Sequence, residues 1–349
     1  MSDRLKTTLG ALELKNPVVA GSGEATMTVN GIRAALKAGA GVVMPKSCNE
    51  AEGAKRQLDH TDYMLLDDRW NPVEWTDHPP IDAHLFCRSG LQQENFDDWL
   101  EKLAMLDKEA EQVGSYVVGH LILNDLEQCV RMAERMQEAG LRAINVLVAA
   151  VHGDQAAKGA IAMVRDPVGV RDVVTRLRKT IKVPLWIKLP GHDVTVLAAA
   201  AREGGADAVN FIDRTLALVP DLKTRAPYLG TMAALGGTWG LPIACRWLAE
   251  TRRRLGPEFP LIGTNGARDG LDVARMLLAG AHAVEMTTAV MLQGAEAIST
   301  SIKQLDDYLA EGGLTVPQII GEAADKLTAY TDQPARPGHW RDFVHEEAR

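Results

Sequence analysis

The chain has 349 residues, of which 46% are hydrophobic and 24% charged, and its formal net charge is −8. This is an ordinary globular composition with enough length for a large core, and its acidic balance disfavours nucleic-acid binding, which needs a basic face. The sequence has neither an apolar run long enough to span a membrane nor the apolar core of a secretory signal at its charged N-terminus.

Short apolar runs alternate with helical patterns along the chain. A hairpin turning at Gly10 is expected first. Strands are then predicted at 17–21, 41–46, 115–122, 141–148, 183–190, 207–212, 259–266 and 282–290. Helices are predicted at 30–40, 95–114, 125–140, 166–181, 195–206, 240–256 and 270–281, and a last long one runs to about Leu309. The helix at 166–181 has a clear start, because Asp166 can cap it and Pro167 suits its first turn.

These β/α units in series predict an α/β fold, a (β/α)8 TIM barrel with an N-terminal hairpin and extended loops at the C-terminal face. The strands are almost wholly apolar, as expected for strands buried on both faces. The barrel is expected to occupy residues 1–312, and 313–349 to form a C-terminal extension that packs on the barrel or on a partner subunit. Segments 47–92, 148–165 and 213–238 exceed ordinary loops, and the first is expected to form a lid or wall of the site.

Two turns near the end of the barrel favour a phosphate site. Gly266 lies in a turn after strand seven, and Thr287 and Thr288 lie between strand eight and its helix. Adjacent helix N-termini present free backbone N–H groups, and barrels commonly bind phosphate at this position. Gly236 and Gly237 follow strand six, where they either let the backbone approach a ligand closely or merely form a helix-entry turn.

Polar residues interrupt the apolar strands at one end of the predicted barrel. Lys46 and Lys188 each end a strand, and Asn145 and Asn210 lie in two others. A confined lysine loses its charge unless an anion compensates. A single lysine there would usually be salt-paired at the rim, but a cluster of four polar residues suits a phosphorylated cofactor that becomes anionic during the reaction.

Several motifs in order resemble the soluble class of the FMN-dependent dihydroorotate dehydrogenase and dihydropyrimidine dehydrogenase barrel family. The matching pieces are "LKNPVVAGSG", "AGAGVVMPKS", "AINV", "VPLWIKLPG", "GGADAVN", "LGGTWG" and "PLIGTNGARDGLDVARMLLAGAHAVEMTTAV". They cover roughly residues 12 to 310. The resemblance implies a cytoplasmic, homodimeric flavoprotein that contains FMN and transfers a hydride between flavin N5 and a carbon of a small, cyclic substrate.

The resemblance also implies individual roles. Ala20 and Gly21 would let the flavin lie against the end of strand one, and Lys46 would contact the flavin and its substrate side. Lys188 would stabilise the reduced anionic flavin near N1, and Asn145 would donate a hydrogen bond near flavin and substrate. The remaining cofactor set is Asn210, Gly236, Gly237, Asn265, Gly266, Thr287 and Thr288. The family usually has Gly-Gly and Gly-Thr where this chain has Asn-Gly and Thr-Thr at the last four, but backbone donors survive such changes.

The residue that moves the proton is missing. The family's strand-four motif reads Asn-x-Ser-Cys-Pro, or has Ser in place of Cys, and this chain has Val148 at the position of that base. Valine cannot transfer a proton. Asp213 also stands where the family usually has Asn, and its charge would repel an orotate-like carboxylate. A substrate other than dihydroorotate or dihydropyrimidine is therefore expected.

Several groups could replace that base. His152, in the same loop, is the leading candidate because imidazole titrates near neutrality. Cys48, His192 and Asp213 are weaker candidates. No enzyme base would be needed for a substrate whose proton exchanges with water, or for an amine that loses a hydride from the adjacent carbon, so the enzyme is expected to act on CH–CH or CH–NH groups.

Two other classes of function remain open. A phosphate-binding aldolase or lyase could use Lys46 or Lys188 as a Schiff-base nucleophile, and a degenerate barrel could bind flavin without turnover. The four cysteines are too far apart for an iron–sulfur cluster or a structural zinc, so no metal site is expected and a reducing compartment is favoured. A direct electron acceptor is therefore expected, such as oxygen, fumarate, a quinone or a partner flavoprotein, with NAD(P)H also possible.

Overall fold

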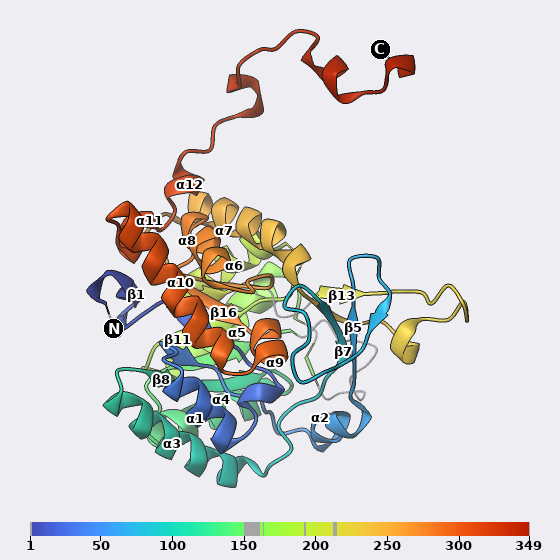
Figure 1. Ribbon diagram of the computed structural model, residues 1–349. Helices are drawn as coiled ribbons and strands as arrows, with labels where there is room; N and C mark the ends of the chain where they lie inside the picture. Colours follow the sequence, from blue (N-terminus) through green and yellow to red (C-terminus); the bar gives the residue numbers. More distant parts are fainter. Residues whose placement is uncertain (1, 150–160, 163, 192, 212–214, 349) are drawn as a thin grey trace.

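The computed structural model describes residues 2–149, 161–162, 164–191, 193–211 and 215–348 (Figure 1). Nine strands of this part of the chain form one parallel sheet in the order β8-β4-β3-β16-β15-β12-β11-β10-β9. Their bounds are β3 Val18–Ala20, β4 Val42–Val43, β8 Tyr116–Val117, β9 Gly119–Ile122, β10 Ile144–Leu147, β11 Leu185–Lys188, β12 Ala208–Asn210, β15 Leu261–Thr264 and β16 Ala283–Met286.

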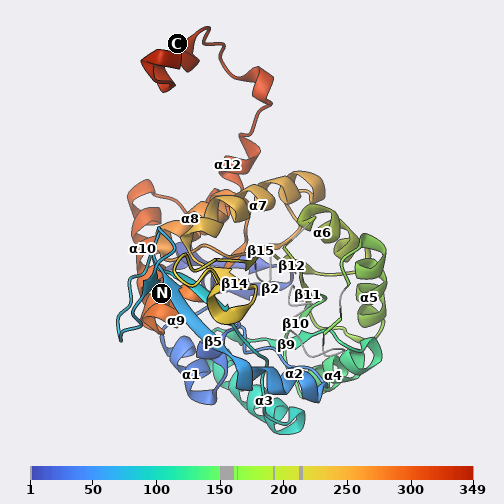
Figure 2. The same ribbon diagram turned by 90° about the vertical axis from the view of Figure 1, so that its right-hand side faces the viewer.

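The sheet closes because β8 and β9 are consecutive pieces of one strand, separated only by Val118. β8 pairs with β4 and β9 pairs with β10, so the two ends of the strand order meet in a barrel (Figure 2). The TIM barrel predicted from the sequence is confirmed, with the difference that its third strand is interrupted at Val118.

Helices surround the barrel (Figure 2). The long ones are α1 Val29–Lys37, α3 Phe96–Gln112, α4 Leu126–Glu138, α5 Pro167–Thr180, α6 Val194–Glu203, α7 Leu241–Leu255, α8 Gly270–Leu278 and α10 Glu296–Gly312. The start of α5 follows the sequence prediction, because the Asp166 carboxylate accepts a hydrogen bond of 2.9 Å from the backbone N–H of Gly169 and Pro167 opens the helix.

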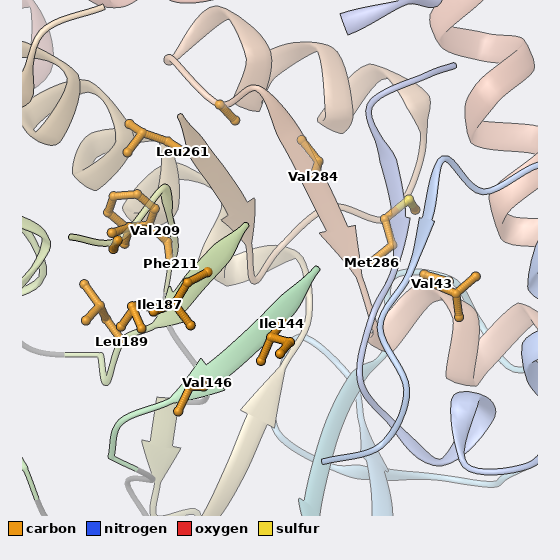
Figure 3. Close-up of a cluster of buried hydrophobic side chains, with 14 of the residues drawn as sticks. Val43, Ile144, Val146, Ile187, Leu189, Val209, Phe211, Leu261, Val284 and Met286 are labelled. Atoms are coloured by element: carbon orange, nitrogen blue, oxygen red, sulfur yellow. The ribbon is translucent and has the colours of Figure 1, made fainter. Parts of the chain in front are cut away.

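The main core lies between the barrel strands and this ring of helices. Alternate residues of each strand, such as Ile144 and Val146 of β10 and Ile187 of β11, point outward into it and are fully buried (Figure 3). The other residues of the same strands point into the barrel. This alternation makes each strand apolar on its outer face and leaves the inner face free to carry functional side chains.

The N-terminal hairpin closes one end of the barrel. β1 (Thr7–Leu9) and β2 (Leu12–Leu14) are antiparallel, as predicted, and Gly10 in their turn has φ +62°. Leu9 and Leu14 are buried in one apolar cluster with inward residues of the barrel strands. The site must therefore lie at the other end, where the strands end.

Two of the long segments pair into a second sheet that the sequence analysis did not anticipate. This five-stranded antiparallel sheet has the order β13-β14-β7-β5-β6. It combines β5 Asp62–Leu66, β6 Pro72–Val73 and β7 His84–Arg88 from the first segment with β13 Thr215–Ala217 and β14 Ala233–Gly236 from the third. The short helix α2 (Glu52–Lys55) precedes it.

The predicted last helix is divided into α9 (Thr288–Gln293) and α10 by Gly294, which has φ +65°. After α10, α11 (Val316–Ile319) and α12 (Glu322–Asp325) pack against α8 and α7. The chain then leaves the barrel, and Tyr330 and Phe343 in this arm are 95% and 75% exposed (Figure 1). Among the described residues, no helix is both long and apolar enough to cross a membrane.

Candidate active site

A layer of polar side chains lies inside the barrel near the ends of the strands. At six places along the barrel strands, a buried apolar residue is followed two positions later by a buried polar residue. Residues two apart in a strand point to the same side, so both members of each pair lie on the inner face of the barrel. The pairs are Val118 and His120, Ala143 and Asn145, Trp186 and Lys188, Ala208 and Asn210, Ile262 and Thr264, and Ala283 and Glu285. Three members of the predicted polar cluster, Asn145, Lys188 and Asn210, lie in this layer together with His120, Thr264 and Glu285, which were not predicted. The fourth, Lys46, belongs to a separate polar group.

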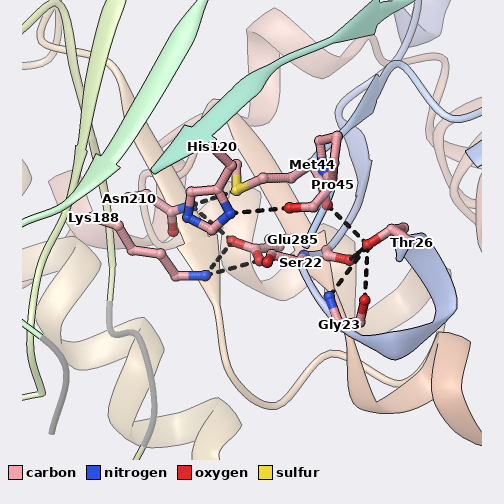
Figure 4. Close-up of polar contacts among 10 residues, drawn as sticks. Ser22, Gly23, Thr26, Met44, Pro45, His120, Lys188, Asn210 and Glu285 are labelled. Atoms are coloured by element: carbon pink, nitrogen blue, oxygen red, sulfur yellow. Dashed lines mark hydrogen bonds and ion pairs between the residues drawn. The ribbon is translucent and has the colours of Figure 1, made fainter. Parts of the chain in front are cut away.

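Glu285 is the centre of this layer. Its side chain is fully buried, and both carboxylate oxygens accept hydrogen bonds from Lys188 Nζ, at 2.9 and 3.1 Å (Figure 4). Asn210 Nδ2 donates to Oε2 at 2.7 Å, and the backbone N–H of Ser22 donates to Oε1 at 3.1 Å. Burial alone would raise the pKa of Glu285, but the charge of Lys188 and these hydrogen bonds outweigh it and lower that pKa.

His120 lies beside the same carboxylate. Its Nδ1 is 3.1 Å from the carbonyl oxygen of Pro45, and its proximity also helps to lower the pKa of Glu285 (Figure 4). In the sheet register His120 is directly opposite Asn145. His120 and Glu285 were not predicted as site residues, although each stands at an inward position of a predicted strand, and this alternation is the signal that could have found them.

Lys46, at the end of the strand that begins with β4, belongs to a second polar group. It is buried, and its Nζ donates to Glu24 Oε1 at 3.0 Å and to Ser89 Oγ at 2.7 Å. Tyr63 on β5 also donates its hydroxyl to Glu24 Oε1, at 2.7 Å. Burial and the adjacent Glu24 carboxylate raise the pKa of Tyr63, so its hydroxyl stays protonated. Glu24, Ser89 and Tyr63 were not predicted as site residues.

Asn145 differs from these residues. Its side chain is fully buried, and neither its amide oxygen nor its amide nitrogen has a hydrogen-bond partner among the described residues. An unpaired buried amide costs free energy, and native structures rarely leave one without a reason. Its position in the polar layer makes a bound ligand the simplest partner.

A cleft opens above the polar layer, between the strand ends and the five-stranded sheet. It encloses about 900 Å³ of empty space, part of it open to solvent. Lys46, Lys188 and Glu285 line its floor, and Leu85, Cys87 and Ala234 of the sheet line its wall. The third group of lining residues follows β14, β15 and β16 and contains Gly236, Gly237, Asn265, Gly266, Arg268, Thr287 and Thr288. The predicted lid segment therefore supplies a wall of this cleft through β7.

Most of the predicted cofactor residues therefore converge on one cleft. Asn145 and Asn210 lie in the buried layer below it. Ala20 does not line it, because its side chain packs in the core between the barrel and the helices. Gly21 follows at the end of β3, where an added Cβ would collide with Thr287 and Glu285. Gly266 has φ +124°, and a Cβ there would collide with the backbone of Leu241. Packing within the protein thus already requires both glycines.

Val148, at the position of the missing base, packs in the core. Val148 is fully buried in the apolar cluster between barrel and helices, and its backbone N–H donates to the carbonyl of Lys188 at 3.2 Å. Cys48 is buried as well, its Sγ lies 3.8 Å from the carbonyl oxygen of His120, and burial raises the pKa of its thiol to about 12. Neither can serve as a base near pH 7.

The other proton-transfer candidates, His152, Asp213 and His192, lie outside the described residues. Within the described residues no group of three or more His, Cys, Asp and Glu side chains is arranged to bind a metal ion.

Comparison with known proteins agrees with this architecture. A family model described as dihydroorotate dehydrogenase matches residues 80–309. The catalytic subunit of dihydroorotate dehydrogenase B (NAD(+)) from Methanocaldococcus jannaschii is 24% identical over 323 residues, which are 91% of this chain and 98% of the relative. The corresponding subunit from Geobacter sp. (strain M21) is 31% identical over 238 residues, 66% of this chain and 75% of the relative.

A relative with a different name has a similar sequence identity to this chain. A putative dihydroorotate dehydrogenase A (fumarate) from Solibacter usitatus is 31% identical over 299 residues, which are 83% of this chain and 88% of the relative. The matched family model covers more than half of the chain and includes most of the strands that build the cleft. The chain therefore belongs to the dihydroorotate dehydrogenase family and is an oxidoreductase of the kind that acts on CH–CH groups.

Proposed function

We propose that this protein is an FMN-dependent oxidoreductase that moves a hydride between the flavin and a carbon of a small, cyclic substrate other than dihydroorotate. The observation that carries the proposal is that Lys188 and the loops after β15 and β16 line one cleft. In the layer below it lies the Asn145 amide, which has no hydrogen-bond partner among the described residues. When bound, FMN would supply a carrier for two electrons, which no side chain can provide.

The floor of the cleft fits the ring of a flavin. A flavin ring has both hydrogen-bond donors and acceptors along its edge. The Asn145 amide, buried in the layer below the floor, offers one of each and has no hydrogen-bond partner to lose among the described residues. Lys188 brings an ammonium group to the floor, held in place by Glu285. These side chains would bind and orient the ring rather than react with it.

The far end of the cleft fits a phosphate. Gly236, Gly237, Asn265, Gly266, Thr287 and Thr288 all line this end, as proposed from the family resemblance. Arg268 lines the cleft next to them, and its Nε donates to Asp272 at 3.0 Å, which fixes the guanidinium at the rim. Backbone N–H groups, two hydroxyls and an arginine are together well suited to a phosphate monoester.

The substrate is proposed to differ from dihydroorotate for three reasons. Val148 occupies the position of the family's base but packs in the core. Asp213 stands where an amide is usual. Lys46 and Lys188 are both paired with carboxylates, so these two lysines of the described floor offer no uncompensated cation to an orotate-like carboxylate. A neutral or cationic ring fits this floor better than an anionic one.

The proton is proposed to pass through a side chain at the substrate side of the cleft. His152 is the leading candidate, and Lys46, Asn145 and Asp213 complete the proposed catalytic set. Lys46 donates to Glu24 and Ser89, so it can hold a substrate oxygen or pass a proton within this group. Replacing His152 with Ala should lower turnover about 100-fold and leave FMN affinity unchanged if His152 moves the proton.

The aldolase alternative is disfavoured by the ion pairs. A lysine that attacks a carbonyl must be uncharged, and a neutral Lys188 would leave Glu285 buried without its counter-ion. A flavin-binding protein without turnover remains the second candidate, favoured by the apolar residue at Val148.

Relatives named as catalytic subunits suggest an electron-transfer partner, and the proposal includes such a partner, a homodimer and a cytoplasmic location. The four free cysteines are consistent with a reducing compartment.

The first experiment is the visible absorption spectrum of the purified protein, with the released chromophore identified by its mass. Bound FMN is the expected result, and substrates can then be screened by bleaching of the flavin under anaerobic conditions. A colourless protein that takes up no added FMN would refute the redox proposal. Bound FMN that no candidate substrate reduces or reoxidises faster than in free solution would favour the non-catalytic alternative.

A further inference from the structure

The two lysines on the floor of the cleft are both neutralised by the protein itself. Lys46 Nζ lies 3.0 Å from Glu24, and Lys188 Nζ lies within 3.1 Å of both oxygens of Glu285. From the sequence, either a salt pair for each lysine or a cofactor that becomes anionic during the reaction was open. The structure provides one carboxylate for each lysine, contributed by loops and strands distant in the sequence.

The two carboxylates differ in how strongly water screens them. The side chain of Glu24 is 24% exposed, whereas that of Glu285 is fully buried and that of Lys188 is 5% exposed. Charges in a buried site act over longer distances than charges at the surface. Glu285 is also fixed from three directions, by Lys188, by Asn210 and by the backbone of Ser22. It is therefore a permanent negative charge at the floor of the cleft.

A lone ammonium and an ion pair act differently on a cofactor that gains negative charge. Uptake of a hydride by an oxidised flavin adds two electrons and one proton to the ring, which then carries one negative charge. A lone cation beside the ring stabilises this product and raises the reduction potential. A paired cation has a much weaker field at the ring, because the field of its counter-ion opposes it.

We propose that Glu285 neutralises Lys188 in order to keep the reduction potential of the flavin low, so that the enzyme works mainly as a reductase of its substrate. The inference rests on the FMN proposal above and deepens it by assigning the direction of the reaction. In that direction a two-electron donor of the NAD(P)H type would reduce the flavin, and a carbon–carbon double bond of the substrate would receive that hydride at one carbon. The other carbon would take a proton from the proposed proton-transfer side chain, so that the double bond becomes a CH–CH bond.

The test compares the potential of the FMN-loaded wild type with that of Glu285→Gln, by equilibration with dyes of known potential. Glutamine retains the shape and removes the negative charge. Its one amide oxygen, at the position of Oε2, can still accept from Asn210 and Lys188, but its NH2 group cannot accept from the backbone N–H of Ser22. The expected result is a rise of at least about 30 mV, which is tenfold in the equilibrium constant of a two-electron couple. Tighter binding of sulfite, which adds to flavin N5 and also leaves the ring negative, should accompany it. Glu109→Gln is the matched control, because Glu109 pairs with Arg33 at the surface of α3, and it should leave the potential unchanged.

A double variant, Lys188→Met with Glu285→Gln, protects the test against a single variant that fails to fold. If Glu285 neutralises Lys188, removal of both charges should leave the wild-type potential almost unchanged. A fall of about 30 mV or more in the double variant would show that Lys188 acts as an uncompensated cation and would overturn the inference. An unchanged potential in a well-folded, FMN-loaded Glu285→Gln would overturn it as well, while the FMN proposal would stand. Wild-type protein that binds no FMN would overturn both.

Discussion

Asp107 on α3 and Arg142 ahead of β10 form an ion pair at the place where the barrel closes. Arg142 donates to the Asp107 carboxylate from Nε at 2.9 Å and from Nη2 at 2.7 Å, and the backbone N–H of Val117 in β8 donates to the same carboxylate at 2.8 Å. The Asp107 side chain is 3% exposed. One buried carboxylate therefore connects a helix to the strand interruption at Val118 and to the next strand.

Replacing Asp107 with Ala should destabilise the fold by about 3 kcal/mol, because it leaves part of the Arg142 guanidinium and the Val117 N–H buried without their acceptor. Urea unfolding of the flavin-free protein measures this loss. Glu109→Ala on the same helix is the control and should cost less than about 1 kcal/mol, since its ion pair with Arg33 is exposed. Equal losses in the two variants would contradict the role given to Asp107.

The stability of the protein should fall between pH 6.5 and about 4 because of His282. Burial, and then the charge of Arg252, lower the pKa of His282 from 6.5 to about 4. Its Nδ1 accepts a hydrogen bond of 3.2 Å from the backbone N–H of Leu261, which only the neutral ring can do. The folded state thus binds fewer protons than the unfolded state in this range. The neutral His282 ring therefore adds its full contribution to the free energy of unfolding above pH 6.5. That contribution, up to about 3 kcal/mol, is lost as the pH falls toward 4.

Urea unfolding at several pH values between 4 and 6.5 tests this expectation against His282→Asn. Asparagine has an acceptor oxygen near the position of Nδ1 but does not titrate, so the variant should lose correspondingly less stability over this range. Parallel curves for the two proteins would show that another group causes the acid sensitivity.

Asn145 should show a trade-off between stability and ligand binding. Its amide has no hydrogen-bond partner among the described residues, so Asn145→Leu, with the same branching, should raise the free energy of unfolding, measured without added ligand, by about 1 kcal/mol. Under the FMN proposal, the same change should weaken FMN binding about tenfold, because the ring would lose a hydrogen-bond partner. Both quantities are measurable on one preparation, by urea unfolding and by titration of flavin fluorescence. A variant that is less stable yet binds FMN normally would mean that the amide has a structural role.

Features of this structure that depend on residues close together in the sequence could be predicted, whereas features that depend on distant residues could not. The barrel strands were predictable because each is a short apolar run between helices, and its burial is a local property of the pattern. The five-stranded sheet was not predictable. Its strands β7 and β14 pair although they lie almost 150 residues apart in the sequence, and neither strand has a residue pattern that indicates which strand it pairs with.

The same limit applies to the cleft. Lys46 and Lys188 were located correctly from their places at strand ends, but their counter-ions were not. Glu285 is 97 residues from Lys188, and Glu24 is 22 residues from Lys46. The two ion pairs could not be predicted for a physical reason: a single sequence identifies charges but not the folded distances between them.

The C-terminal segment should contain two parts of unequal importance, divided at Lys326 rather than at 312. Val316 and Ile319 are fully buried against the barrel, and Arg252 on α7 donates from Nε and Nη2 to Asp325, both at 2.8 Å. Beyond Lys326 the arm has exposed side chains such as Tyr330.

Removal of 327–349 should therefore change the free energy of unfolding by less than about 0.5 kcal/mol. Removal of 314–349 should cost about 3 kcal/mol or more, because two buried aliphatic side chains leave the core and Arg252 loses its acceptor. Urea unfolding of both truncated proteins beside the full chain, at low protein concentration, separates the two parts. A large loss from the shorter truncation, growing with protein concentration, would instead mean that the arm packs on a second copy and contributes to stability there.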